Sequence, residues 1–255
     1  MDRDAAQGAL RVTCILPVYN GARYLRDAIE SVLSQTQPLL ETIVVDDGST
    51  DGTAEVIAAY EDRVRSVRQA NAGPAAARNQ GVALARGDLI AFQDADDVWH
   101  PEKIARQMAR FAMHPELELC STHLQNFWVP ELQQEADRFG NDVRSRPFPG
   151  YGAPPTLLVR RALFDTVGGF KATLRVGSDV DWFIRAVEQG VVMEILPDVL
   201  VRRRWHAANI SRGPRPELAQ VLKDSLDRRR EDRRRAATPI SPPSPSSGTP
   251  DGGAP

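Results

Sequence analysis

The sequence predicts an α/β fold in which helices flank a mostly parallel central sheet. Short apolar runs alternate with segments whose apolar residues recur at helical spacing, and no internal repeat is present. Such alternation is typical of βαβ units. Three of the apolar runs end in polar turns at residues 18–20, 46–51 and 93–97. Because ligands of such sheets bind beyond the carboxyl ends of the strands, we expect these turns to lie close together.

The first half of the chain contains four strand–helix units. The first apolar run, VTCILP, is nearly continuous, as expected of a strand buried on both faces. Apolar residues at helical spacing follow it, and the same order then recurs. The expected strands are 12–17, 42–45, 64–67 and 89–92, and the expected helices are 24–33, 53–60, 74–85 and one that starts near Pro101.

The second half is less regular. A strand is expected within 117–127, and the glycine- and proline-containing stretch 130–155 is interpreted as a long excursion. The chain then returns to the sheet at 156–159, forms a short helix over 181–189, and adds one or two strands over 191–201, interrupted at Pro197. A helix follows over 217–235. Residues 1–236 are therefore predicted to form one domain, and the Pro/Ser/Gly-rich tail 237–255 is predicted to be disordered.

Composition narrows the class of protein. The 255 residues are 42% hydrophobic and 26% charged, which is ordinary for a soluble globular protein. The net charge of −2 argues against nucleic acid as a partner. The two cysteines, Cys14 and Cys120, form no disulfide framework or zinc motif. The sequence shows neither a signal peptide nor an apolar run long enough for a membrane span, so we expect a cytoplasmic protein.

An arginine-rich stretch near the C-terminus, RRREDRRR at residues 228–235, has two interpretations. It could attract the anionic inner face of a membrane and make the protein peripheral there. A solvated helix end explains it equally well, because Glu231 and Asp232 interrupt the positive charge.

The clearest chemical signal is the segment QDADD at residues 93–97. It places Asp94, Asp96 and Asp97 within four residues at the end of a buried strand. Carboxylates this close repel one another unless a cation or hydrogen-bond donors compensate. Oxygen ligands of this kind suit Mg²⁺ or Mn²⁺, which usually also bind substrate phosphates. The alternative is a polar turn that caps the next helix, with Asp97 as the cap.

Two further segments are compatible with nucleotide binding. The first, VVDDGSTDGT at residues 44–53, follows a strand with aspartates, a glycine and small hydroxyl residues. A strand-to-helix turn with capping residues explains it as well. The second, NAGPAAARNQG at residues 71–81, places Arg78 near a helix N-terminus, where arginine can bind phosphate. A solvated helix face is the common alternative for one arginine.

The ordered set of PVYN, VVDDGSTDGT, NAGPAAARNQG and ARGDLIAFQDADD resembles the N-terminal half of glycosyltransferase family 2, a family with the GT-A fold. Two later segments extend the resemblance to about residue 211. GSDVDWFIR at residues 177–185 is similar to the acidic catalytic segment of the family, and RRWHAANIS at residues 203–211 is similar to its closing segment.

The resemblance assigns roles to individual residues. Pro17, Tyr19 and Asn20 would belong to the donor site, with the tyrosine ring stacked on the base. Asp47 would accept a hydrogen bond from the base, typically uracil, and Arg78 would contact the diphosphate.

The remaining roles concern the metal and the reaction. Asp94 and Asp96 would form the D-x-D pair that meets the ribose and the metal, Mn²⁺ or Mg²⁺, and Asp97 could share that work. His206 would meet the metal or the diphosphate. Asp179 matches the general base of the family. The implied protein is an inverting, metal-dependent glycosyltransferase that moves a sugar from a nucleoside-diphosphate donor to a hydroxyl-bearing glycan or lipid-linked acceptor, in the synthesis of polysaccharide, glycolipid or cell-envelope glycan.

The sequence departs from the family pattern at two positions. Ser178 replaces an acidic residue before Asp179, which leaves Asp181 as a rival general base, and Gln93 replaces a hydrophobic residue. Two other functions compete with this one. A nucleotidyltransferase should have a glycine-rich, basic signature near its N-terminus, where this chain has PVYNGARYL. A binding module without turnover stays open because of Ser178.

Overall fold

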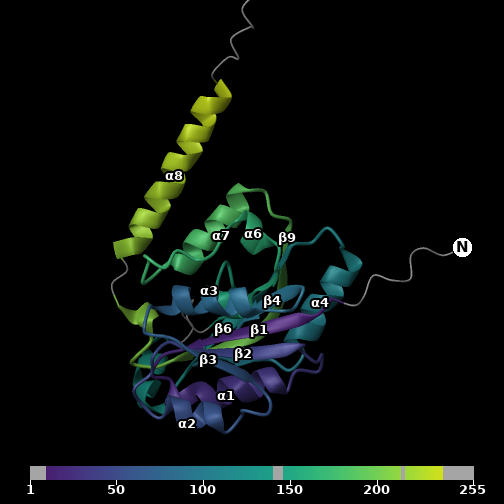
Figure 1. The fold of residues 1–255 in the computed structure, drawn as a ribbon. Helices are drawn as coiled ribbons and strands as arrows, with labels where there is room; N and C mark the ends of the chain where they lie inside the picture. Colours follow the sequence, from purple (N-terminus) through teal and green to yellow (C-terminus); the bar gives the residue numbers. More distant parts are fainter. Residues whose placement is uncertain (1–9, 140–145, 214–215, 238–255) are drawn as a thin grey trace, which may run out of the picture.

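The computed structural model describes residues 10–139, 146–213 and 216–237. A mixed β-sheet lies between two layers of helices (Figure 1). In chain order the elements are β1 (Val12–Val18), α1 (Ala22–Leu33), β2 (Glu41–Asp46), α2 (Thr53–Ala58), β3 (Arg65–Arg68), α3 (Pro74–Leu84), β4 (Leu89–Phe92), β5 (Val98–Trp99), α4 (Lys103–Met113), β6 (Leu119–Trp128), η1 (Pro130–Leu132), α5 (Gln133–Phe139), β7 (Phe148–Pro149), η2 (Pro154–Thr156), β8 (Leu158–Arg160), α6 (Leu163–Thr166), α7 (Ser178–Glu188), β9 (Met193–Trp205), η3 (Ile210–Arg212) and α8 (Pro216–Ala237).

The order of strands in the sheet is β3-β2-β1-β4-β8-β6-β9-β5, and β7 pairs with β6. As predicted, β3, β2, β1 and β4 are parallel. The other half of the sheet is mixed: β8 is antiparallel to both β4 and β6, β9 is parallel to β6, and β5 is antiparallel to β9. Because β4 and β5 are consecutive in the chain but far apart in the sheet, residues 93–97 cross the edge towards which β4, β6 and β9 run and at which the antiparallel β8 begins.

The two helical layers bury opposite faces of each strand, because successive side chains of a strand point to opposite sides. Leu16 and Val44 pack with α1 and α2, whereas Ile15 and Val45 pack with α3, α6 and α7. A third cluster, on the side of α1, packs α4 against β1, β4 and β6. The fully buried strand β1 therefore explains the continuous apolar run with which the sheet begins.

The structure differs from the sequence prediction in the second half. The stretch 130–155, expected to be a long irregular excursion, contains the short elements η1, α5 and β7. Its residues 140–145 lie outside the described residues. The strand β9 passes through Pro197 instead of ending there. The register of its pairing with β6 shifts around His123, so the chain bulges at Pro197. Proline has no N–H to donate, and within the bulge the sheet loses no hydrogen bond because of it. Helix α7 begins at Ser178, three residues earlier than predicted.

The last helix, α8, begins beside α7 and projects away from the body of the molecule (Figure 1). Arg228 and Ser225 both contact Glu188 of α7, at 2.9 Å and 2.5 Å. Among the described helices, none has the length and apolarity that a bilayer span requires. The predicted disordered tail lies outside the described residues, apart from Ala237, which ends α8.

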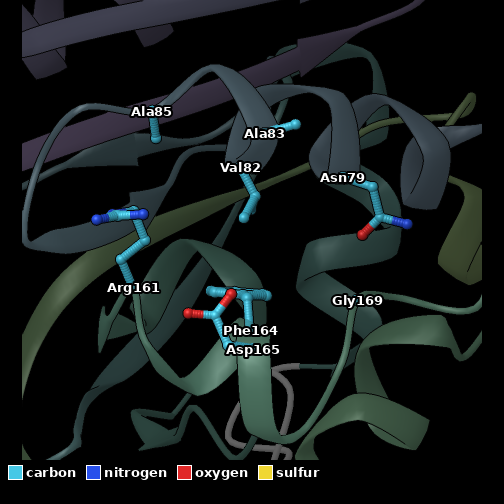
Figure 2. Close-up of a pocket in the computed structure, with 8 residues that line it drawn as sticks. All are labelled: Asn79, Val82, Ala83, Ala85, Arg161, Phe164, Asp165 and Gly169. Carbon is cyan, nitrogen blue, oxygen red and sulfur yellow. The ribbon is translucent and has the colours of Figure 1, made fainter.

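A cavity of about 310 Å³ opens between α3 and the segment 161–169 (Figure 2). The side chains of Asn79, Arg161 and Asp165 line it. Arg161 donates a hydrogen bond to the carbonyl oxygen of Gly87, just before β4. The cavity therefore lies towards the amino-terminal edge of the parallel strands, opposite the turns with the candidate site residues.

Lys103 is a charged group in the hydrophobic core, since its side chain is fully buried in α4. Its Nζ donates a hydrogen bond to Gln107 Oε1 at 2.8 Å and lies 4.2 Å from the ring centre of Trp99. Burial lowers the pKa of Lys103 from 10.5 to about 7, because the core solvates the ammonium group poorly. At neutral pH and below, burial of the protonated Lys103 therefore lowers the free energy of unfolding, because the unfolded chain keeps this group in water.

We predict that Lys103→Met changes how stability depends on pH. In the parent, the destabilisation from Lys103 is complete below pH 7 and disappears as the pH rises towards 10.5, because only the unfolded chain binds the proton between these values. The stability of the parent relative to the variant should therefore rise with pH over this window. Urea unfolding of both proteins at several pH values measures it. A difference that stays constant across the window would contradict the prediction.

Candidate active site

The turn at residues 93–97 is held from beneath by Gln93, whose side chain is fully buried. Gln93 Nε2 donates hydrogen bonds to the carbonyl oxygen of Asp97 at 2.8 Å and to Ser31 Oγ at 3.3 Å. The backbone N–H of Asp97 donates to the carbonyl oxygen of Asp94 at 3.2 Å. A polar side chain at position 93 thus ties the turn to α1, which a hydrophobic residue cannot do.

Asp94 is paired with Arg78, the residue that the sequence resemblance assigns to the diphosphate. Arg78 Nη2 lies 2.8 Å from Asp94 Oδ1, and the arginine is only 8% exposed. Its guanidinium group also lies 5.8 Å from the ring centre of Phe170, and its buried Nε has no hydrogen-bond partner in the described structure. Burial raises the pKa of Asp94, an effect that the charge of Arg78 opposes.

Asp96 is bound by residues 205–212, which overlap the stretch 203–211 of the sequence resemblance and are called the closing segment from here on. Asp96 Oδ2 lies 2.9 Å from His206 Nε2 and accepts a hydrogen bond from Asn209 Nδ2 at 3.1 Å. His206 is itself buried, and its ring lies 4.8 Å from that of Tyr24. The D-x-D turn and the closing segment, both predicted site elements, therefore meet.

The outer oxygens of the two aspartates remain accessible. The side chains of Asp94 and Asp96 are 31% and 32% exposed, and in the described structure Asp94 Oδ2 and Asp96 Oδ1 have no hydrogen-bond partner. No three acidic, histidine or cysteine side chains of the described residues form a closed metal cage. A Mg²⁺ or Mn²⁺ ion bound through one or two carboxylates, substrate phosphates and water needs no such cage, so this donor set fits one.

Asp97 faces the protein interior. Its side chain is buried, and Oδ1 accepts a hydrogen bond from the backbone N–H of Arg204 at 2.9 Å. Burial and the nearby charges of Asp96 and Asp94 raise its pKa well above the ordinary value. Asp97 therefore holds β9 against the turn.

The turns after β1 and β2 are bonded to each other through Asn20. Its backbone has a positive φ of 50°, which asparagine tolerates better than most residues. The N–H of Asn20 donates to Ser49 Oγ at 2.9 Å, and Asn20 Oδ1 accepts from the N–H of Thr50 at 2.8 Å. Beside it, Tyr19 is 52% exposed, while Pro17 is buried within β1. The exposed tyrosine ring is free to stack on a ligand.

Asp47 has a buried carboxylate that binds the loop before α3. Oδ1 accepts hydrogen bonds from Gln69 Nε2 at 2.8 Å and from the N–H of Ala72 at 2.9 Å, and Oδ2 accepts from the N–H of Gly73 at 2.8 Å. These bonds fix the loop that leads to Arg78. The predicted contact between Asp47 and a nucleobase stays a prediction.

The two candidate bases, Asp179 and Asp181, have opposite environments. Asp181 is fully buried, and its oxygens pair with Lys171 Nζ at 2.7 Å and Arg185 Nε at 2.8 Å. Asp179 is half-buried in the first turn of α7 and has no hydrogen-bond or ion-pair partner among the described residues. Only Asp179 is therefore available to a substrate.

Aromatic packing connects the first turn of α7 to Arg78. The Phe170 ring beneath the guanidinium group lies 5.7 Å from the ring of Trp182, and Trp182 is one helical turn after Asp179. Asn79, next to Arg78, accepts a hydrogen bond from the N–H of Phe170 at 2.8 Å. Asp179 and Asp94 are thus on elements that pack around the same aromatic cluster.

Sequence reasoning gave no individual role to three residues that organise the site, although Arg204 lies within the matched stretch 203–211. Tyr24, expected only on the apolar face of a helix, packs against His206 and lies 4.7 Å from the guanidinium group of Arg204. Arg204 binds the turn at two points, Asp97 and the carbonyl oxygen of Asp96. Glu135 binds the closing segment. The i,i+4 spacing of Asp181 and Arg185 was visible in the sequence; no signal pointed to Glu135.

Comparison with known proteins places these features in a family. The model of "Glycosyl transferase family 2" matches residues 13–177. Putative glycosyltransferase EpsE of Bacillus subtilis is 32% identical over 197 residues, which cover 71% of this chain and 68% of EpsE. The putative teichuronic acid biosynthesis glycosyltransferase TuaG of the same organism is 42% identical over 101 residues, 38% of this chain and 40% of TuaG.

Other relatives are longer than this chain. The chain matches 31% of the length of an uncharacterized glycosyltransferase of Nostoc sp. and 64% of the length of one of Rickettsia prowazekii. Among solved structures, S. aureus TarS 1–349 in complex with UDP-GlcNAc superposes with a TM-score of 0.70 at 19% identity, over 86% of this chain and 66% of that one. This likeness shows a shared fold.

The contrast between the two aspartates of α7 predicts different effects on stability. Asp181→Ala leaves Lys171 and Arg185 without their partner, and we expect a loss on the order of 3 kcal/mol in the free energy of unfolding. Asp179→Ala removes no such contact and should change it by less than about 0.5 kcal/mol. Chemical denaturation measures both. Equal losses would show that Asp179 has a structural partner.

Proposed function

The chain belongs to glycosyltransferase family 2 and has the GT-A fold, and from this premise we propose that it transfers a sugar from a nucleoside-diphosphate donor to a hydroxyl acceptor with inversion at the anomeric carbon. One observation carries the proposal: Asp94 and Asp96 each present an accessible oxygen beside Arg78 and His206, and Ala95 between them lies next to Gly21 in the turn after β1. Cationic and hydrogen-bonding groups in this arrangement suit a diphosphate.

The donor is proposed to be a UDP-sugar. Tyr19 would stack on the base, next to Pro17 and Asn20, and Asp47 would meet the base from the second turn. Donors in this family typically carry uridine, and TarS, which shares this fold, was solved with UDP-GlcNAc. The guanidinium group of Arg78, which pairs with Asp94 at 2.8 Å, would supply positive charge to the diphosphate.

In the proposed reaction, Asp179 accepts the proton of the acceptor hydroxyl as its oxygen attacks the anomeric carbon. The new C–O bond forms while the bond to the diphosphate oxygen breaks, and the electron pair leaves with the nucleoside diphosphate. Arg78 stabilises the charge that accumulates on this leaving group. Asp94, Asp96 and His206 would hold a Mn²⁺ or Mg²⁺ ion, which supplies further stabilisation of that charge.

The acceptor is proposed to be a cell-envelope glycan or its lipid-linked precursor. The relative TuaG is named a putative teichuronic acid biosynthesis glycosyltransferase. A lipid-linked acceptor would require contact with the cytoplasmic face of a membrane, and the exposed Arg229 and Arg230 of the projecting α8 would favour an anionic surface.

Metal dependence gives the first test. We expect no nucleoside diphosphate release from a panel of UDP-sugars by Asp96→Ala, and none by the parent in EDTA until Mn²⁺ is restored. Asp198→Ala, which alters a surface carboxylate paired with Arg106, is the control and should keep parental activity. Full activity of the parent in EDTA would refute the metal, and inactivity of the parent towards every nucleotide sugar would refute the proposed function.

The general base gives the second test. Asp179→Asn should lose about 10²–10⁴ in turnover, the usual contribution of a base, while UDP affinity stays near the parental value. Asp165→Asn, an exposed carboxylate of α6, serves as the control. If Asp179→Asn turns over normally at saturating acceptor, Asp179 is not the base.

A further inference from the structure

Glu135, in a part of the chain that no sequence motif covers, contacts both ends of the closing segment. Its Oε1 accepts hydrogen bonds from Trp205 Nε1 at 3.0 Å and from Arg212 Nη1 at 2.8 Å, and its Oε2 accepts from Arg212 Nη2 at 2.8 Å. One carboxylate of α5 therefore holds the first and the last residue of the segment.

Between these two ends lie the groups that bind Asp96. The N–H of His206 donates to Asn209 Oδ1 at 2.6 Å, and the N–H of Asn209 donates to the carbonyl oxygen of His206 at 3.3 Å. The segment thus forms a small turn with His206 and Asn209 aimed at Asp96 Oδ2. Any rotation of this turn would move both side chains away from the D-x-D pair.

We propose that Glu135 is a positioning residue that fixes the closing segment so that His206 and Asn209 meet Asp96 and the donor diphosphate. This inference rests on the proposed function, because it assigns the purpose of the contact to donor binding. A side chain at the chemistry must be held to within about 0.5 Å by supporting contacts, and the bidentate pair with Arg212 fixes both distance and orientation.

The ion pair between Glu135 and Arg212 is less exposed to solvent than the nearby pair between Arg23 and Glu131. The side chains of Glu135 and Arg212 are 26% and 29% exposed, so solvent screens them only partly. The guanidinium group of Arg212 also lies 5.6 Å from the ring centre of Trp205, which orders all three side chains together. By contrast, the pair between Arg23 and Glu131 is 63% and 57% exposed, and such a pair contributes little. Among the described contacts, Glu135 is therefore the side chain of α5 that hydrogen-bonds this segment.

The test compares Glu135→Ala and Glu135→Gln with a control on the same helix. Asp137→Asn alters an exposed side chain whose described contact is with Gln133, and it leaves the closing segment untouched. Hydrogen–deuterium exchange is followed at the amides of His206, Asn209 and Arg212, which all donate hydrogen bonds. We expect roughly tenfold faster exchange in Glu135→Ala, an intermediate rate in Glu135→Gln and the parental rate in the control.

The second arm measures the affinity for UDP in the presence of Mn²⁺ by calorimetry. We expect Glu135→Ala to weaken it roughly tenfold, and Glu135→Gln to recover part of the loss because one acceptor oxygen remains. Arg212→Ala should produce a similar loss, and the double variant little more than either single variant, since both changes break one contact.

The outcomes separate the inference from the proposed function. Parental exchange in Glu135→Ala would overturn the inference, and so would faster exchange with unchanged UDP affinity. Absence of UDP binding and of donor turnover in the parent would instead refute the proposed function; the exchange rates, which need no substrate, would then still decide whether Glu135 holds the segment.

Discussion

The structure depends on compensating three carboxylates within four residues at the centre of one sheet edge. Each aspartate of the turn recruits a different element: Asp94 pairs with Arg78 of α3, Asp96 with His206 and Asn209, and Asp97 with the backbone of β9. Like charges at this separation would disfavour the fold without partners. The same contacts that neutralise the turn therefore bring the helix, the last strand and the closing segment to one place.

The parallel half of the sheet was predictable because local signals agree there. Continuous apolar runs, helical spacing and polar turns each indicate the same βαβ order, and this order places the turns after β1, β2 and β4 at one edge of the sheet. The strand through Pro197 was not predictable, because a proline normally ends a ladder and only the long-range register with β6 permits a bulge. The contact of Glu135 with Trp205 joins residues 70 apart and has no local pattern at all.

A motif also cannot say which way a carboxylate faces. Asp96 and Asp97 are adjacent, yet one has an accessible oxygen and the other is buried against a backbone amide. In the same way Asp179 is partly exposed and Asp181 is buried. The difference arises because α7 starts at Ser178, directly after Gly177, whose backbone is left-handed with a φ of 83°. This start sets which side of the helix each residue occupies. Choosing between such neighbours requires the position of the helix to within one residue, and sequence patterns locate helix ends less precisely.

The partners of Asp96 lie 110 and 113 residues further along the chain. During synthesis the ribosome releases the D-x-D turn long before His206 and Asn209, so a nascent chain that has already formed its first parallel strands still has an unfinished centre. Local βαβ units form early, whereas contacts of high sequence separation form late. We therefore expect this protein to become able to bind ligands only after residues 206–209 have been synthesised and have reached Asp96.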